Sequence, residues 1–165
     1  MEKVYTEKEL QKFLSLAINI ASEAHLKILD KGDKAYILHP LRIMFKVAYD
    51  PILMMIAVLH DVIEDSDYTI QDLRELGFPE RVLDALSLLT HDDEVLYDEY
   101  IKLISKNIDA IIIKLEDLKD NSNITRLKGL RQKDLDRTEK YHKSFTFLVG
   151  ELYSLDPKLH AIHHL

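Results

Sequence analysis

Glycine and proline are scarce in this chain, and their scarcity limits the folds that it can adopt. The 165 residues include only four glycines and four prolines. Tight turns between short strands depend on these two residue types, so few such turns can form. The sequence therefore predicts long helices and an all-α fold class.

Apolar side chains recur at the spacing of amphipathic helices. Thr6 and Glu9 form the pattern of a capping box, and apolar residues follow three or four positions apart. The segment Ile52–Glu64 is apolar on nearly all sides before its charged end, so we expect a central, buried helix. The β-branched run within 108–119 could form a strand, but a lone strand would have no partner, so a helix is favoured. The expected helices cover about 6–29, a segment from Pro40, 52–64, 69–76, 79–89, 93–107, 108–119 and 135–154.

Length and charge limit the domain organisation and the class of ligand. The sequence predicts one domain over 1–165, with a motif-bearing core at about 20–125 and C-terminal helices at 134–163. The net charge of −7 argues against binding to a nucleic-acid polymer, because such proteins present a basic face. A small anionic nucleotide or phosphate remains compatible with that charge, since a metal or a few cations can hold it. The oligomeric state stays open.

The chain shows no signal for secretion or for membrane insertion. Its first residues are charged, and its longest apolar stretch, 52–59, is too short to cross a bilayer. The sequence therefore predicts a soluble, cytoplasmic protein. Cysteine is absent, which excludes disulfides and thiolate metal sites. Any metal would have to bind to histidine and carboxylate groups.

The adjacent residues His60 and Asp61 end the most apolar segment and are followed by Glu64 and Asp65. Helical spacing would place His60 beside Glu64, and Asp61 beside Asp65. Carboxylates crowded at a helix end need a counter-charge, which a divalent cation could supply. The alternative is a solvated acidic helix end without a metal, and the dipeptide alone does not decide between the two interpretations.

Two further positions favour the metal-binding interpretation. His39 precedes Pro40 at an expected loop-to-helix junction, and Asp117 ends another apolar segment. Together with His60 and Asp61 they offer two imidazoles and two carboxylates. Such a nitrogen–oxygen site leaves open positions for water and substrate, so these four residues are candidate ligands of a divalent metal.

Three sequence blocks between about His25 and Asn123 carry a resemblance to a known family: AHLKILDKGDKAYILHPLRIM, AVLHDVIEDSD and IKLEDLKDNSN. In order and spacing they resemble the RelA/SpoT-type HD hydrolases, including the small single-domain alarmone hydrolases. The resemblance implies a single HD-domain helical bundle. It also implies one metal, usually Mn²⁺, on His39, His60, Asp61 and Asp117.

The resemblance further implies an activity and roles for individual residues. The expected reaction hydrolyses the bond between the 3′-pyrophosphate and the ribose of a guanosine tetra- or pentaphosphate, without synthetase activity. Glu64 and Asp65 match the acidic pair that handles the attacking water. Lys31, Tyr36 and Asn121 match positions near the substrate. Lys31 could equally be an exposed lysine, and Tyr36 a packing residue.

The chain departs from the family at positions linked to the base. Asp30 stands where these hydrolases usually carry an arginine that stacks on guanine, and Ala35 replaces a proline. The segment Leu118-Lys119-Asp120 stands where they usually carry Arg-Leu-His. Two alternatives to alarmone hydrolysis therefore stay open: a phosphohydrolase for another nucleotide or phosphate ester, and a non-catalytic helical metal-binding module.

The remaining histidines and arginines carry weaker signals. We interpret His25 as a residue that orients the site or packs beneath it, and His91 as a surface residue. The C-terminal histidines are interpreted as part of a frayed helix rather than as a second metal site: His160, His163 and His164. Three arginines either steer an anion toward the site or balance nearby acids: Arg126, Arg131 and Arg137.

Overall fold

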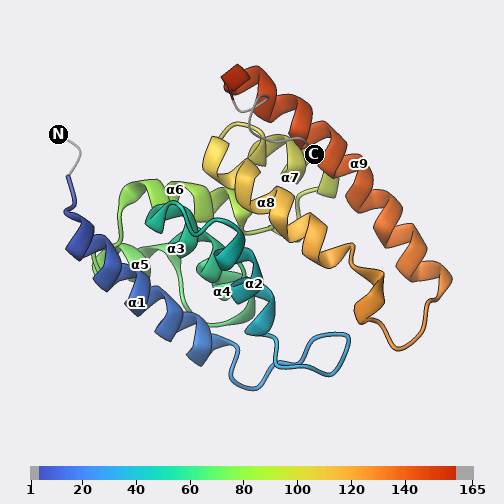
Figure 1. The fold of residues 1–165 in the computed structure, drawn as a ribbon, viewed down its shortest axis with the longest axis horizontal. Coiled ribbons are helices and arrows are strands. Elements are labelled where there is room, and N and C mark those ends of the chain that lie inside the picture. The colour runs from blue at the N-terminus through green and yellow to red at the C-terminus, as the bar shows by residue number, and fades with distance from the viewer. Residues whose placement is uncertain (1–3, 159–165) are drawn as a thin grey trace. The chain divides into compact units, whose positions relative to one another are not determined.

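A computed structural model describes residues 4–158 of the chain. Within this range the regular secondary structure is helical, apart from one isolated antiparallel bridge between Leu29 and Ala35. The predicted all-α class is therefore confirmed. Over the same range, no helix has both the length and the apolar character that a bilayer crossing demands. In chain order the helices are α1 (Glu7–Ala24), α2 (Leu38–Lys46), α3 (Pro51–Leu59), α4 (Val62–Asp65), α5 (Ile70–Glu75), α6 (Glu80–Leu89), α7 (Tyr97–Ile104), α8 (Ile108–Asn121), the short 3₁₀ helix η1 (Ile124–Arg126) and α9 (Gln132–Leu155), as Figure 1 shows.

The helices belong to two compact units, Met1–His91 and Asp92–Leu165. In the first unit α3 is central, because α1, α2 and α6 all pack against it. In the second unit α8 and α9 pack along each other, and α7 contacts both. The organisation of the whole chain as one domain stays a prediction.

Helix α3 is a buried helix with a well-defined start. The Asp50 side chain accepts a hydrogen bond from the Ile52 backbone N–H, and Pro51 occupies the first helical position, where its missing N–H costs nothing. Seven side chains of α3 are buried: Ile52, Leu53, Met55, Ile56, Ala57, Val58 and Leu59. The prediction of a central apolar helix at this place is confirmed.

The expected helix 52–64 is divided, with His60 and Asp61 between α3 and α4. His60 Nδ1 lies 2.8 Å from the Ala57 carbonyl oxygen. In a continuous helix that carbonyl would accept from the Asp61 N–H, so the imidazole competes with the main chain at the point where the helix breaks. The break leaves both side chains at a junction rather than within a helix.

Local signals explain most of the other helix ends. A capping box forms at Thr6, as the sequence predicts, and a second one forms at Thr69. Gly77 has a φ of 87° and ends α5 with hydrogen bonds from Gly77 N to Arg74 O and from Phe78 N to Leu73 O, the pattern of a Schellman motif.

Two helices are shorter than expected. Helix α1 ends at Ala24 instead of about Leu29, and α7 begins at Tyr97 instead of 93. Before α7, Asp92 accepts hydrogen bonds from Glu94 N on its side chain and from Val95 N on its carbonyl, so these residues form a turn. The C-terminal histidines and the predicted helical segment beyond 158 lie outside the described residues.

Candidate metal centre

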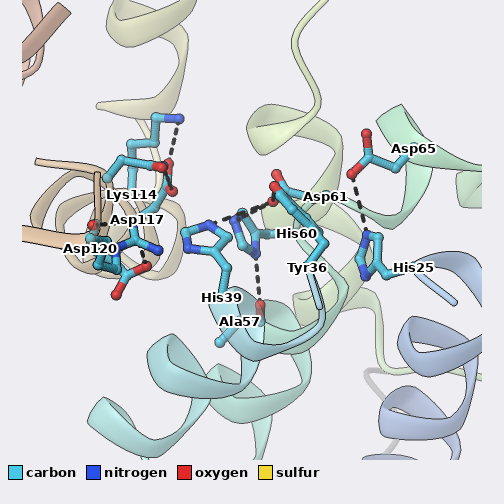
Figure 2. A network of polar contacts seen from close by, with 12 residues as sticks. His25, Tyr36, His39, Ala57, His60, Asp61, Asp65, Lys114, Asp117 and Asp120 are labelled. Atoms are coloured by element: carbon cyan, nitrogen blue, oxygen red, sulfur yellow. Dashed lines mark hydrogen bonds and ion pairs between the residues drawn. The ribbon is translucent and has the colours of Figure 1, made fainter. Parts of the chain in front are cut away.

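Three of the four predicted metal ligands come together within the first unit. His39 lies in the first turn of α2, and His60 and Asp61 lie between α3 and α4. Asp61 Oδ2 is 3.1 Å from His60 Nε2 and 3.7 Å from His39 Nε2, and the two imidazole centroids are 5.3 Å apart (Figure 2). Both histidines are buried. Two imidazoles and one carboxylate therefore converge on one small volume.

The donor set fits a divalent cation. Because His60 Nδ1 donates to the Ala57 carbonyl, a neutral His60 ring carries its lone pair on Nε2. That lone pair faces the Asp61 carboxylate at 3.1 Å, and two acceptors at this distance repel each other unless a proton or a cation lies between them. Nitrogen and oxygen ligands of this kind suit Mn²⁺, Fe²⁺ or Zn²⁺.

Tyr36 contacts a predicted metal ligand. Its hydroxyl donates to Asp61 Oδ2 at 2.5 Å, and its ring lies 5.6 Å from the His39 ring between centroids. Its backbone N–H donates to the Ile28 carbonyl, which ties the end of the 29–35 loop to the residue that precedes the loop. The tyrosine thus orients Asp61, and its predicted contact with substrate stays a prediction.

The predicted acidic pair lies on α4, one turn beyond Asp61. Asp65 N donates to the Asp61 carbonyl at 3.0 Å, which sets this spacing. Glu64 Oε1 accepts from the backbone N–H of His91 at 2.6 Å, and Asp65 Oδ2 lies 3.4 Å from His25 Nε2. Both carboxylates come from exposed residues. Water can therefore reach the pair while each member keeps a protein contact.

Lys31 is exposed in the loop that the Leu29–Ala35 bridge closes. Asp30, which precedes it, accepts hydrogen bonds on Oδ1 from Gly32 N at 2.8 Å and from Lys34 N at 2.9 Å. The carboxylate that replaces the family's arginine therefore supports the loop backbone. The role of Lys31 in binding phosphate stays a prediction.

In the second unit, two neighbours on the same helix hold Asp117. Lys114 Nζ lies 2.9 Å from Asp117 Oδ2 (Figure 2). The Asn121 amide donates to Asp117 Oδ1 at 2.5 Å. Burial disfavours the Lys114 ammonium, but the Asp117 charge and hydrogen bond outweigh that effect and raise the pKa of Lys114. Lys114 was not predicted, although its spacing of three residues from Asp117 on a helix was a usable signal.

The three arginines that follow Asn121 pair with acids of the second unit. Arg126 Nη2 donates to the Asp120 carbonyl at 2.6 Å and lies 3.3 Å from its carboxylate. Arg131 and Arg137 lie 3.6 and 3.4 Å from the Asp134 carboxylate. These contacts favour the interpretation that the arginines balance nearby acids.

Several characterised proteins are similar in sequence to this chain, although no family model matches it. A guanosine-3′,5′-bis(diphosphate) 3′-pyrophosphohydrolase from Aquifex aeolicus is 31% identical over 140 residues, which cover 72% of this chain and 20% of that protein. A protein of the same name from Spiroplasma citri is 30% identical over 146 residues, which cover 80% of this chain and 19% of that protein. A GTP pyrophosphokinase from Streptomyces coelicolor is 29% identical over 122 residues, which cover 67% of this chain and 14% of that protein. The chain thus spans 20% or less of the length of these relatives.

A solved structure supports the fold. It is described as a metazoan ortholog of SpoT that hydrolyzes ppGpp, and it matches with a TM-score of 0.66 and 22% identity over 94% of this chain and 98% of the other. This likeness confirms the helical fold. The sequence similarity, in turn, covers most of the chain. The chain is therefore similar in sequence to one part of guanosine-3′,5′-bis(diphosphate) 3′-pyrophosphohydrolases.

Proposed function

We propose that this chain is a metal-dependent HD-family phosphohydrolase that removes the 3′-pyrophosphate from guanosine 3′,5′-bis(diphosphate). The observation that carries the proposal is the convergence of His39, His60 and Asp61 in a chain similar to pyrophosphohydrolases of that name. The proposed partner is a small anionic nucleotide, and neither a nucleic-acid polymer nor a membrane. A cytoplasmic location and the oligomeric state stay predictions.

In this proposal the metal, probed as Mn²⁺, is held by four residues: His39, His60, Asp61 and Asp117. The Ala57 carbonyl supports the set by fixing the His60 ring, and Tyr36 supports it by donating to Asp61. Lys114 and Asn121 do the same for Asp117. A divalent cation supplies Lewis acidity that activates water and offsets charge on a phosphate.

The remaining residues act on water and on the nucleotide. The exposed carboxylates of Glu64 and Asp65 can accept a proton from the attacking water. The water oxygen bonds to the phosphorus next to the ribose, and the 3′-oxygen leaves, which releases pyrophosphate and a nucleoside 5′-diphosphate. Lys31, Tyr36 and Asn121 are the proposed substrate contacts.

A second phosphohydrolase function is favoured by specific departures from the family. Asp30 is engaged with the loop backbone, and Leu118-Lys119-Asp120 lacks the family's arginine and histidine. These positions are linked to base recognition, so another nucleotide or phosphate ester is the alternative substrate. A non-catalytic metal-binding module is the third hypothesis, which the intact Glu64-Asp65 pair disfavours, because a protein without catalysis would not need it.

A nucleotide panel tests the proposal. Purified protein with Mn²⁺ is incubated with guanosine 3′,5′-bis(diphosphate), guanosine diphosphate and other phosphate esters, and pyrophosphate and orthophosphate release are measured. Pyrophosphate from the first compound is the expected product. Hydrolysis of other esters alone would move the assignment to the second function.

Asp61→Ala is the matched variant for this assay. It should abolish turnover, because it removes a ligand that faces both imidazoles, while circular dichroism should show that the helices remain. Full activity in Asp61→Ala would mean that the site is placed wrongly. Metal analysis completes the design: a protein that neither contains nor binds a divalent metal would support neither enzymatic function.

A further inference from the structure

His25 is a buried histidine outside the proposed ligand set. It caps the C-terminus of α1, and only 1% of its surface is exposed. Neither ring nitrogen makes a hydrogen bond within the described residues. A buried polar atom without such a bond costs about 1–3 kcal/mol. A hydrophobic residue of similar size would fill this place at lower cost, so the imidazole needs another explanation.

The nearest charged group explains why an imidazole lies here. His25 Nε2 is 3.4 Å from Asp65 Oδ2, slightly beyond the usual range of about 2.7–3.2 Å for a hydrogen bond (Figure 2). The Asp65 side chain is 33% exposed, so it reaches water while its Oδ2 faces the buried ring. A small rotation of either side chain would complete the bond.

Aromatic packing fixes the plane of the His25 ring. Tyr36 packs edge-on against it, with 5.0 Å between ring centroids and 60° between planes. The same tyrosine donates to Asp61. One side chain thus supports both the proposed metal ligand and the histidine that faces the proposed base.

From this geometry we infer that His25 is a positioning residue for Asp65. Its Nε2–H holds the Asp65 carboxylate in the orientation from which the other carboxylate oxygen accepts the proton of the attacking water. The proton passes from water to Asp65, the water oxygen bonds to phosphorus, and His25 keeps its own proton throughout. The inference rests on the proposed function, because it assigns Asp65 to the water.

Two substitutions separate positioning from packing. His25→Leu keeps most of the volume and removes both nitrogens, whereas His25→Gln keeps an N–H close to the place of Nε2. His25→Leu should lower kcat about 10–100-fold, the usual effect of losing a residue that orients a catalytic group, with KM and Mn²⁺ affinity within about twofold. His25→Gln should restore most of kcat. Unchanged kcat in His25→Leu, or an equal loss in both folded variants, would overturn the inference.

A double-mutant cycle tests whether His25 acts through Asp65. In an Asp65→Asn background, adding His25→Leu should leave kcat unchanged, because the positioned group is already lost. Losses that simply multiply would show that the two residues act separately, and would contradict the inference.

A third measurement does not depend on turnover. Ring ¹⁵N NMR of the metal-free protein should show the His25 resonances shift in Asp65→Asn, while those of His39 stay in place. If the protein hydrolyses no nucleotide, the proposed function fails and this spectrum still decides whether the His25–Asp65 contact exists. An unchanged His25 spectrum would overturn the positioning role whatever the substrate.

Discussion

At the scale of single residues, the candidate centre depends on how Asp61 is held. Its Oδ2 atom accepts from the Tyr36 hydroxyl and also faces His60 and His39. A carboxylate fixed in this way loses little rotational freedom when it binds a cation. Groups that orient a ligand commonly affect metal affinity about 10–100-fold.

Tyr36→Phe therefore separates support of the metal from contact with the nucleotide. The variant removes one hydroxyl and keeps the ring that packs on His25 and His39. We expect Mn²⁺ affinity, measured by calorimetry, to fall about tenfold. If Mn²⁺ affinity is unchanged and only KM for the nucleotide rises, Tyr36 is a substrate contact and does not support the metal.

At the scale of elements, turn and cap residues determine where helices begin and end. Gly77 adopts a φ of 87°, which side chains with a Cβ rarely tolerate, and the Phe13 ring lies 3.6 Å from where that Cβ would stand. Gly150 lies within α9 with open space around it. The two glycines therefore respond differently to the same substitution.

Gly77→Ala should lower the free energy of unfolding by about 1 kcal/mol or more, because alanine is strained at this φ. Gly150→Ala, the matched control, should raise it by about 0.5–1 kcal/mol, since alanine favours a helix interior. Urea unfolding monitored by circular dichroism measures both. Equal effects of the same sign would contradict the assigned backbone conformation.

The capping box of α5 predicts a pH dependence. Hydrogen bonds from the Thr69 hydroxyl and backbone lower the pKa of Asp72. A carboxylate with a lowered folded pKa stabilises the protein above its unfolded pKa of about 3.9, and this contribution is lost as pH falls through the folded pKa. Asp72→Asn should therefore show a smaller loss of stability than the wild type when urea unfolding is followed below about pH 4. Identical curves would exclude this role.

These elements also show what the sequence could and could not predict. The capping pattern at Thr6, and the buried segment after Pro51, identified helices because each depends on neighbouring residues. The break at His60 depends on a side chain bonding a backbone carbonyl, which hydrophobic periodicity does not reveal. Residue types suggested the metal ligands, whereas the contact between His25 and Asp65 joins the ends of two helices and required the fold.

At the scale of the whole molecule, the four proposed metal ligands are unevenly divided along the chain. Ligands His39, His60 and Asp61 belong to Met1–His91, and Asp117 belongs to Asp92–Leu165. A ligand that binds only the folded state stabilises it by about 2.7 kcal/mol at a concentration one hundred times its Kd. Metal binding can therefore be measured by its effect on the stability of the folded protein as well as by its effect on activity.

Mn²⁺ should raise the Tm of the wild-type protein, and a chelator should reverse the increase. Asp117→Asn should reduce the Mn²⁺-dependent increase as strongly as Asp61→Ala does, if both carboxylates bind the same ion. Thermal scans over a Mn²⁺ series give the comparison. If Asp117→Asn keeps the full Mn²⁺-dependent increase in Tm, Asp117 is not a metal ligand, and the ligands are His39, His60 and Asp61.

The loop that Leu29 and Ala35 close has a consequence for how such a protein can diverge. Its backbone is held by the Asp30 carboxylate and by the Tyr36 N–H bond to Ile28, while the side chains of Lys31 and Lys34 are exposed. Exposed loop positions away from special contacts usually change stability by less than about 0.5 kcal/mol when substituted. Mutations can therefore accumulate at these two positions without disturbing the buried histidines, so that ligand preference can evolve while the proposed catalytic chemistry is inherited unchanged.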